Sequence, residues 1–396
     1  MKTKWGWAYI SLGLLSLLAA MLLGCGASSV TPTRMLVTAD WANSRVLIHN
    51  VPFSTNQAAS LVLGQPDFTQ YAEKLTADGL AGAQAVAVDG SGNVYVGQYG
   101  INGTFACRVS VFQPPLSNGM RASVVLGEPD FTTGACTTSA TGLTSPQGLA
   151  LDSSGNLWVS DVMDSRIVQF KPPFRNGMAA SLVIGQTDFA GNLCNRGGPP
   201  SASTVCMPGG VAFDTQGNLW VADNFNSRVL RFRPPFTTGM AASLVIGQPD
   251  MTSIAPGTLA TVMAGPAALA FDLAGNLWVA DYANTRVLQF QPPFTNGMAA
   301  SLVIGHANFT DNSFAFPPTS SATMVPASLA FDTDGRLIVA DLFRNRTLIL
   351  TPPFSNGMAA SVILGQPDSV SWLGNQNGSF TPAANTLYMP SWVTTW

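Results

Sequence analysis

The sequence predicts an all-β fold, a six-bladed β-propeller built from four-stranded blades. A unit of about sixty residues recurs along the chain, and each copy reads as four short strands joined by tight turns. The two ends of the chain match complementary parts of one further unit. Four-stranded units that repeat radially form a propeller, because a single unit cannot bury both faces of its sheet.

The unit is clearest in residues 208–250, PGGVAFDTQGNLWVADNFNSRVLRFRPPFTTGMAASLVIGQPD. GVAFD and LWVAD are short apolar runs, RVLRF alternates apolar and basic residues, and ASLVIG is a fourth β-forming run. The turns TQGN and NFNS separate the first three runs, and Pro234 and Pro235 end the third because proline cannot donate to a ladder. Further copies begin at Pro146, Pro266 and Pro326, and a looser one begins at Ala83.

The two ends of the chain predict how the ring closes. Residues 389–396, MPSWVTTW, align with the first strand of the unit, whereas residues 35–40, MLVTAD, align with its second strand. We therefore expect the N- and C-terminal strands to share one blade, which leaves no free sheet edge at the closure.

The repeated pattern resembles a known family. P-x-G-V-A-x-D-x-x-G-N-x-W-V-A-D-x-x-N-x-R-V, as it stands at 208–229, is similar to the NHL repeat. The resemblance extends over residues 34–396 and implies a propeller. It leaves the function open, because the NHL family contains enzymes, RNA binders and extracellular recognition modules.

The N-terminal segment resembles a secretion signal. Lys2 and Lys4 precede an apolar stretch, 8–23, and the residues LLGC at 22–25 resemble a bacterial lipobox with Cys25 as the lipidated residue. An ordinary signal peptide and an uncleaved anchor are the alternatives. The predicted segments are a lipoprotein signal peptide (1–24), a lipidated cysteine and tether (25–33) and the propeller (34–396).

Composition restricts the partners. The chain has 18 Lys and Arg against 21 Asp and Glu, a formal net charge of −3. It lacks the basic footprint that a nucleic-acid backbone requires. We expect an extracytoplasmic protein of the cell envelope (of the outer membrane in a Gram-negative cell), with a glycan, peptide or envelope protein as partner and the membrane reached through the lipid anchor alone.

Four further cysteines predict disulfides. Cys194 and Cys206 share one long inter-blade loop, whereas Cys107 lies in a turn between a second and a third strand and Cys136 in the next inter-blade loop. These two kinds of loop leave a propeller on the same face. An exported protein permits the pairs 107–136 and 194–206, with the other pairings and metal binding as alternatives.

Charged pairs recur from blade to blade. An Asp closes the second strand and an Arg opens the third, and arginine offers a bidentate fork to a carboxylate. We interpret the pairs as exposed structural clamps worth about 0–1 kcal/mol each, joined by Asp67, Asp188 or Asp250 from the turn after the fourth strand. The alternative is a ring of polar sites. The five pairs are Asp40–Arg45, Asp161–Arg166, Asp223–Arg228, Asp281–Arg286 and Asp341–Arg346, and Gln98 with Arg108 marks an altered sixth unit.

Two other columns of the repeat have structural interpretations. An Asp ends each of five first strands and is expected to bond the backbone of its own turn. The tryptophans within second strands are expected in the core between blades. The aspartates are Asp89, Asp152, Asp214, Asp272 and Asp332, and the tryptophans are Trp158, Trp220 and Trp278.

The start of each first strand should face the mouth of the central channel. The resemblance implies that enzymes of this architecture hold a metal there, with carboxylates and amides in gluconolactonase-like lactonases and histidines in amidating lyases of NHL type. Neither His49 nor His306 lies at such a position. The six residues in this column are Gln84, Gln147, Gly209, Ala267, Ala327 and Ser391. We therefore predict no catalytic residue, no metal and no cofactor.

Aromatic residues vary just after the second strands, where the rest of the unit repeats. Such variation is typical of a recognition surface, and flat neutral side chains suit stacking on sugars or anchoring of peptides. The alternative is that they pack beneath the inter-blade loops. The candidate ligand-binding residues are Trp41, Tyr99, Phe225, Tyr282 and Phe343.

These observations favour an exported, lipid-anchored NHL-type propeller that acts as a non-catalytic binding or scaffold module of the cell envelope. The alternative is a metal-assisted hydrolase or lyase, lactonase-like or amidating-lyase-like, with an atypical site.

Overall fold

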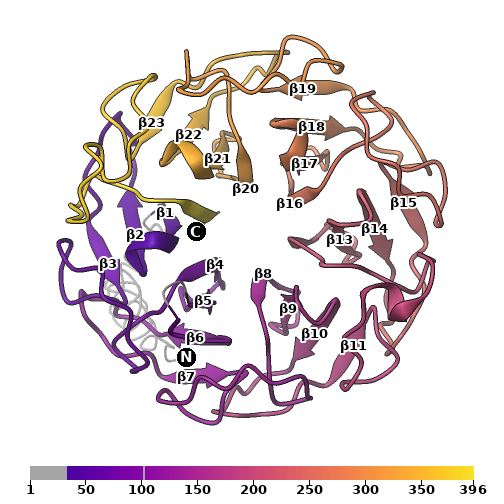
Figure 1. Cartoon of the computed structure of the whole chain (residues 1–396), viewed down its shortest axis with the longest axis horizontal. Helices are drawn as coiled ribbons and strands as arrows, with labels where there is room; N and C mark the ends of the chain where they lie inside the picture. Colours follow the sequence, from indigo (N-terminus) through magenta and orange to yellow (C-terminus); the bar gives the residue numbers. More distant parts are fainter. Residues whose placement is uncertain (1–33, 101–102) are drawn as a thin grey trace, which may run out of the picture. The chain divides into compact units, whose positions relative to one another are not determined.

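The computed structural model describes residues 34–100 and 103–396. In this part of the chain the strands form six antiparallel sheets of four strands each, arranged as the blades of a ring (Figure 1). The predicted all-β, six-bladed propeller is confirmed. The predicted signal peptide (1–24), the lipidated Cys25 and the rest of the tether (26–33) lie outside the described residues.

The first and second strands of the blades form the inner half of the ring (Figure 1). The first strands are β24 (Pro390–Thr395), β4 (Ala83–Val88), β8 (Pro146–Leu151), β12 (Val211–Phe213), β16 (Pro266–Phe271) and β20 (Pro326–Phe331). The second strands are β1 (Met35–Asp40), β5 (Val94–Gln98), β9 (Leu157–Asp161), β13 (Leu219–Asp223), β17 (Leu277–Asp281) and β21 (Leu337–Asp341).

The third and fourth strands lie toward the rim (Figure 1). The third strands are β2 (Arg45–Asn50), β6 (Arg108–Phe112), β10 (Arg166–Phe170), β14 (Arg228–Phe232), β18 (Arg286–Phe290) and β22 (Arg346–Leu350). The fourth strands are β3 (Leu61–Leu63), β7 (Val124–Leu126), β11 (Leu182–Ile184), β15 (Leu244–Ile246), β19 (Leu302–Ile304) and β23 (Val362–Leu364).

Helical structure in residues 34–100 and 103–396 is limited to short 3₁₀ turns. They are η1 (Trp41–Asn43), η2 (Cys194–Gly197), η3 (Tyr282–Asn284) and η4 (Leu342–Arg344). Within those same residues, a helix with the length and apolar character needed to span a membrane is not found.

The ring closes as the sequence predicts. Strand β24 from the C-terminal end pairs antiparallel with β1 from the N-terminal side, with Leu36 opposite Thr395 and Thr38 opposite Val393. The backbone N–H of Met35 donates to the carbonyl of Trp396 at 2.9 Å. One blade is therefore built from both ends of the described chain.

Tryptophans of the second strands form the core between blades, as expected. The Trp220 ring is fully buried, and its centroid lies 4.9 Å from that of Phe294 in the next blade, edge to face. Its indole N–H donates to Asp214 at 2.8 Å, and Asp214 also accepts from the backbone N–H groups of its own turn. Trp158 and Trp278 repeat both contacts, with Asp152 and Asp272.

The Asp–Arg pairs have one register throughout the ring. In each pair the two residues face each other at the end of the hairpin between the second and third strands. The arginine Nε donates to the aspartate Oδ2 at 2.7 Å in four pairs and at 3.0 Å in the Asp161–Arg166 pair. Both side chains are 0% exposed in all five pairs, so the expectation of exposed clamps is wrong.

The buried arginines hold the inter-blade loops. Arg228 donates through Nη2 to the carbonyls of Ser201 and Thr204 at 2.9 and 3.0 Å, in the loop before the first strand. Through Nη1 it contacts the carbonyl of Met251, in the loop after the fourth strand. Each clamp therefore joins its hairpin to the loops on both sides of its blade.

The acidic residues expected as third members of the clamps lie elsewhere. Asp250 is exposed, and its carboxylate accepts hydrogen bonds from the backbone N–H groups of Thr252 and Ser253 at 2.8 and 2.9 Å. Asp67 and Asp188 cap their own turns in the same way. The clamp arginines take loop carbonyls as further partners instead, because the loops pass directly over them.

Two disulfides link the predicted cysteines, Cys107 to Cys136 and Cys194 to Cys206. The backbone N–H of Cys206 donates to Oδ1 of Asp223 at 2.7 Å, so the second disulfide is tied to a clamp. Both predicted pairings are confirmed.

In the blade formed by β4–β7, which lacks the clamp aspartate, the carboxylate near the buried arginine comes from a different position. Gln98 stands opposite Arg108, and the guanidinium donates to the amide oxygen at a long 3.4 Å. Burial lowers the pKa of Arg108 to about 10, while the negative charge of Glu128 opposes this shift. Glu128 is itself buried and occupies the position that Gln248 occupies in the blade formed by β12–β15. The altered blade therefore has an amide, Gln98, where the other blades have the clamp aspartate, and a carboxylate, Glu128, in place of the glutamine.

Replacement of Asp223 by Asn should leave Arg228 buried without a counter-charge. Removing one partner of a buried ion pair costs about 3–5 kcal/mol, and we expect this loss in the free energy of unfolding of Asp223→Asn, measured by urea denaturation. The matched control is Asp250→Asn, the same change at an exposed turn of the same blade, which should lie within about 0.5 kcal/mol of the parent. Equal stabilities of the two variants would contradict the structural role of the clamp.

Candidate ligand-binding site

In five blades the first strand begins with a local irregularity that turns one side chain toward the channel. In these blades the pairing with the second strand skips the second residue of the first strand. In the fourth blade that residue, Gly209, precedes β12. A bulge of this kind redirects a side chain out of the regular alternation. The residues affected are the predicted mouth residues, Gln84, Gln147, Gly209, Ala267, Ala327 and Ser391.

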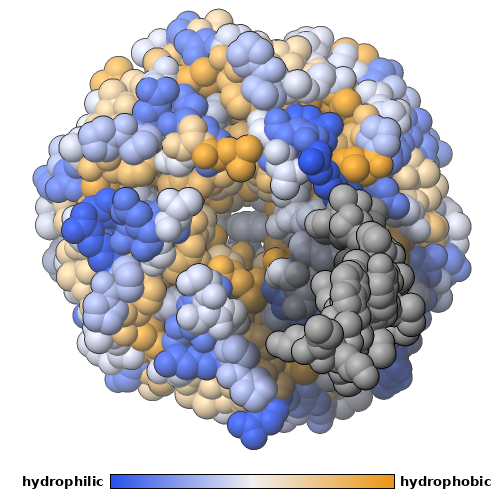
Figure 2. Space-filling model, turned by 180° about the vertical axis from the view of Figure 1, so that it is seen from behind, coloured by the Kyte–Doolittle hydropathy of each residue, from blue (hydrophilic) through white to orange (hydrophobic). Residues whose placement is uncertain are grey.

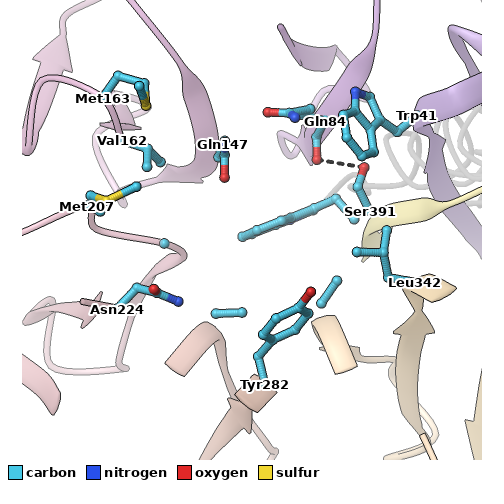
Figure 3. A pocket seen from close by; sticks show the side chains of 14 residues that line it. Trp41, Gln84, Gln147, Val162, Met163, Met207, Asn224, Tyr282, Leu342 and Ser391 are labelled. Carbon is cyan, nitrogen blue, oxygen red and sulfur yellow. Dashed lines mark hydrogen bonds between the residues drawn. The ribbon is translucent and has the colours of Figure 1, made fainter. Parts of the chain in front are cut away.

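These six residues line a cavity of about 350 Å³ at one end of the central channel. Such a volume is at the lower end of the range for small-molecule sites, about 300–1,000 Å³. The ring is also hollowed at its centre on the face opposite to the view of Figure 1, where the coloured part of the border includes apolar residues (Figure 2). The rest of the lining consists of Trp41, Val162, Met163, Met207, Asn224, Tyr282, Leu342 and Trp392 (Figure 3).

The cavity is electrically neutral. Within the described part of the chain, none of the fourteen residues that line it is acidic, basic or histidine. The Tyr282 side chain extends into the cavity, and burial raises the pKa of its hydroxyl, which therefore stays protonated and available as a donor (Figure 3). The site is suited to an uncharged ligand.

Two buried polar atoms in the wall lack partners. Gln84 is 9% exposed, and its Oε1 accepts no hydrogen bond from any described residue. The Nε1 of Trp41, beside it in Figure 3, is likewise buried and donates to no described residue. A buried polar group without a partner costs about 1–3 kcal/mol.

Other polar groups of the wall are held in fixed orientations. The Ser391 hydroxyl contacts the carbonyl of Gln84 at 3.0 Å, and the Gln147 amide donates to Ser145 at 3.1 Å. The Asn224 amide donates to the carbonyl of Pro266 at 3.1 Å. One hydrogen of each group is directed to the protein, which fixes the orientation of the group and leaves its oxygen as an acceptor for a ligand.

Trp392 forms the floor of the cavity. It lines this cavity and also a second one of about 280 Å³ deeper in the channel, so its indole lies between the two. It packs against core clusters of several blades. On the opposite side of the ring, a Cβ at Gly210 would lie 3.0 Å from Cη2 of Trp392. The side chain therefore spans the channel where the other blades have Ala85, Gly148, Gly210, Ala268 and Ser328.

The structure brings together two of the five predicted aromatic residues. Trp41 and Tyr282 line the cavity. Phe343 is 44% exposed outside it, with its ring 6.4 Å from that of Tyr282, and Phe225 is 67% exposed. Tyr99 is half-buried and does not belong to the lining. A ligand-binding role for these five residues remains a prediction.

Sequence reasoning missed several lining residues, among them Trp392, Asn224 and Met207. The repeat does mark Trp392, because it is a large residue at a position where the other blades have glycine, alanine or serine. Asn224 also had a signal, because it directly follows Asp223 as Trp41 follows Asp40 and Tyr282 follows Asp281. Met207 lies in a loop whose sequence differs from blade to blade, so the repeat does not indicate where its side chain points.

The histidines lie apart from this cavity. His49 is buried on β2, where burial and the nearby charge of Arg45 lower its pKa to about 4. The Nε2 of His306 lies 2.8 Å from the Thr285 hydroxyl. In residues 34–100 and 103–396, no three His, Cys, Asp or Glu side chains gather closely enough to hold a metal ion.

One hairpin at the mouth carries an additional acid. Asp164 stands where Asn226 stands in the fourth blade, and it follows the lining residue Met163. Its carboxylate lies 2.9 Å from Arg166. Burial, together with the neighbouring charge of Asp161, raises the pKa of Asp164 from 3.8 to about 6.

Comparisons with known proteins agree with the repeat pattern. The family model described as NHL repeat matches residues 143–170 and 205–232, so the chain carries NHL repeats. A mouse peptidyl-glycine alpha-amidating monooxygenase is 31% identical over 176 residues, which are 43% of this chain and 16% of that protein. A Drosophila melanogaster peptidyl-alpha-hydroxyglycine alpha-amidating lyase is 35% identical over 88 residues, 22% of this chain and 19% of that protein. The chain thus spans a small part of each relative.

Solved structures share the fold. A Bacteroides caccae protein of unknown function superposes with a TM-score of 0.51 at 11% identity, covering 92% of this chain and 98% of that one. A Bacteroides fragilis protein with a provisional 6-phosphogluconolactonase assignment gives 0.50 at 14% identity, covering 93% and 99%. At these identities the comparison concerns the fold alone.

Replacement of Asp164 by Asn should change how stability depends on pH. A carboxyl group whose pKa is raised on folding destabilises the folded state at high pH, and this cost disappears as the pH falls through the folded value of about 6 toward 3.8. We therefore expect Asp164→Asn to raise the melting temperature at pH 8 and to match the parent near pH 4. The control, Asn226→Asp, should behave in the opposite way. A pH-independent difference would disprove the assignment.

Proposed function

We propose that the propeller is a non-catalytic binding module of the cell envelope, with the cavity at the channel mouth as its ligand site. The observation that carries the proposal is a neutral cavity whose wall combines the aromatic side chains of Trp41, Tyr282 and Trp392 with amide and hydroxyl groups. Pockets of this kind, mostly apolar with a few polar groups that fix orientation, are typical of small-molecule sites.

The proposal places the protein outside the cytoplasm and attaches it by a lipid. Its support is the charged start at Lys2 and Lys4, the apolar stretch 8–23 and the cysteine at 25 after Leu-Leu-Gly. The two disulfides are consistent with an oxidising compartment. Its partner is a glycan, a peptide or another envelope protein.

A metal-assisted lyase or hydrolase is the second candidate. The observation that favours it is the similarity to amidating enzymes over 176 residues. The residues at the mouth do not fit a metal, however. The polar groups of the lining are amides, hydroxyls and an indole N–H, whereas zinc sites use His, Cys and carboxylate ligands and calcium sites combine carboxylates with other oxygens. The binding module is therefore the better-supported function.

The two candidates differ in their response to ligands and metals. We expect the melting temperature to rise with a glycan or peptide that is recovered unchanged, and to stay constant with EDTA, Ca²⁺, Mg²⁺, Mn²⁺ or Zn²⁺. A ligand at a hundred times its dissociation constant stabilises by about 2.7 kcal/mol, which a melt detects. A metal-specific rise that EDTA reverses, together with turnover of a peptidyl-alpha-hydroxyglycine, would instead establish the lyase.

A cavity-filling variant localises the binding. Ala327→Phe places a ring in the mouth cavity and should abolish the ligand-induced shift. The control is Ala274→Phe, at an exposed turn between β16 and β17, which should keep the shift. Retention of the shift in Ala327→Phe would exclude the mouth as the site.

The lipid anchor has its own test. Replacement of Cys25 by Ala removes the only thiol of the LLGC motif, so we expect the protein to leave the membrane fraction and to lose the mass of an attached lipid in intact-protein mass spectrometry. Cys25→Ala protein that stays lipidated or membrane-bound would contradict lipid anchoring at this residue.

A further inference from the structure

We infer that the ligand of the mouth cavity is an uncharged saccharide, with one sugar ring stacked on Trp392. The inference rests on the proposed function and names the chemical class of the ligand. Three properties of the cavity lead to it: its neutral wall, its aromatic floor and the mixture of donors and acceptors that it offers.

The neutral wall disfavours charged ligands. A carboxylate, phosphate or ammonium group that enters the cavity gives up its hydration, and the described lining offers it no ion of opposite sign. The clamp arginines lie beneath the loops with 0% exposure, already bonded to aspartates and carbonyls. They are not available to a ligand.

The floor suits a flat ring with an apolar face. Trp392 spans the channel, and Trp41 and Tyr282 contribute aromatic surface to the wall. Sugar rings present a face of C–H groups that packs on aromatic rings, while their hydroxyls project outward around the edge. A ring that lies on the floor therefore directs its hydroxyls toward the surrounding wall.

The polar groups of the wall require a partner that both donates and accepts. The Tyr282 hydroxyl, which extends into the cavity, is available to a ligand as a donor (Figure 3). The oxygens of Gln147, Asn224 and Ser391 add further acceptors. A hydroxyl group is both donor and acceptor, so a polyol satisfies this set, whereas an aliphatic or aromatic hydrocarbon does not.

The position of Trp392 favours a saccharide over a peptide. Because the Trp392 side chain lies between the mouth cavity and the deeper one, it narrows the channel for an extended chain. A peptide that entered by its end would bring a charged terminus into the neutral cavity. A terminal sugar ring is neutral and compact, and the remainder of a glycan can leave through the open mouth.

The test uses the full-length protein and three sets of probes. The first contains the neutral saccharides maltotriose, cellotriose and N,N′-diacetylchitobiose. The second contains glucuronic acid and sialyllactose, and the third contains acetylated and amidated tripeptides together with free ones. Binding is followed by tryptophan fluorescence, because Trp41 and Trp392 both line the cavity, and by saturation-transfer NMR.

We expect millimolar or tighter binding of at least one neutral saccharide, a change in tryptophan emission, and weaker or no binding of the acidic sugars. Gln84→Leu should weaken saccharide binding by about tenfold to a hundredfold, because a ligand hydroxyl then faces an apolar side chain. Gln147→Leu is a second variant with the same expectation. Gln113→Leu is the matched control, an exposed amide outside the cavity, and should bind like the parent.

Each outcome decides between the claims. Tripeptide binding that Ala327→Phe abolishes, without saccharide binding, would overturn the saccharide assignment and leave the proposed function standing. Saccharide binding that is equal in the parent, Gln84→Leu and Gln147→Leu would overturn the assignment to this cavity. Absence of binding by every probe, together with metal-dependent turnover, would overturn both.

Discussion

The buried Asp–Arg pair is the interaction on which the rest of the structure depends. It fixes the hairpin between the second and third strands, and through the remaining arginine and aspartate hydrogen bonds it holds the loops before and after each blade. Several mouth residues lie between clamp partners, as Trp41 does between Asp40 and Arg45. A deeply buried charge pair is expensive to desolvate. Here the arginine donates hydrogen bonds to the aspartate and to carbonyls of the loops, and these bonds fix the positions of the loops.

Residues that recur from blade to blade and residues that differ between blades have different structural origins in this chain. The clamps, the turn aspartates and the tryptophans between blades recur because every blade must solve the same packing problem. Residues that differ from the repeat occur where a blade packs or balances its charges differently from the others. Glu128 replaces an amide where Gln98 replaces a carboxylate, so the charge near Arg108 is moved and kept. Trp392 has no such compensation in its own blade, and its partners are the small residues of the blades across the channel.

The sequence predicted the architecture well, because the repeat carries it. Blade number, ring closure and the mouth column all follow from aligning the copies. It predicted less about the site. Burial of the clamps depends on loops that pass over them, and these loops share no pattern. The cavity floor depends on the indole of Trp392 crossing the channel to Gly210, a contact between residues 182 positions apart that no local rule describes.

Closure of the ring and formation of the site are consequently one event. Trp392 belongs to β24, where it lies opposite Ala39 of β1, so the floor is set in place when the strands from the two ends of the propeller pair. Ser391, beside it, contacts the carbonyls of Ala83 and Gln84 in the next blade and so connects the closing strand to the wall that carries the unpartnered amide. An incompletely closed ring would lack both the floor and this contact. Binding at the mouth is therefore linked to closure, and a ligand that rests on Trp392 stabilises the pairing of β24 with β1 by the same free energy with which the closed ring favours the ligand.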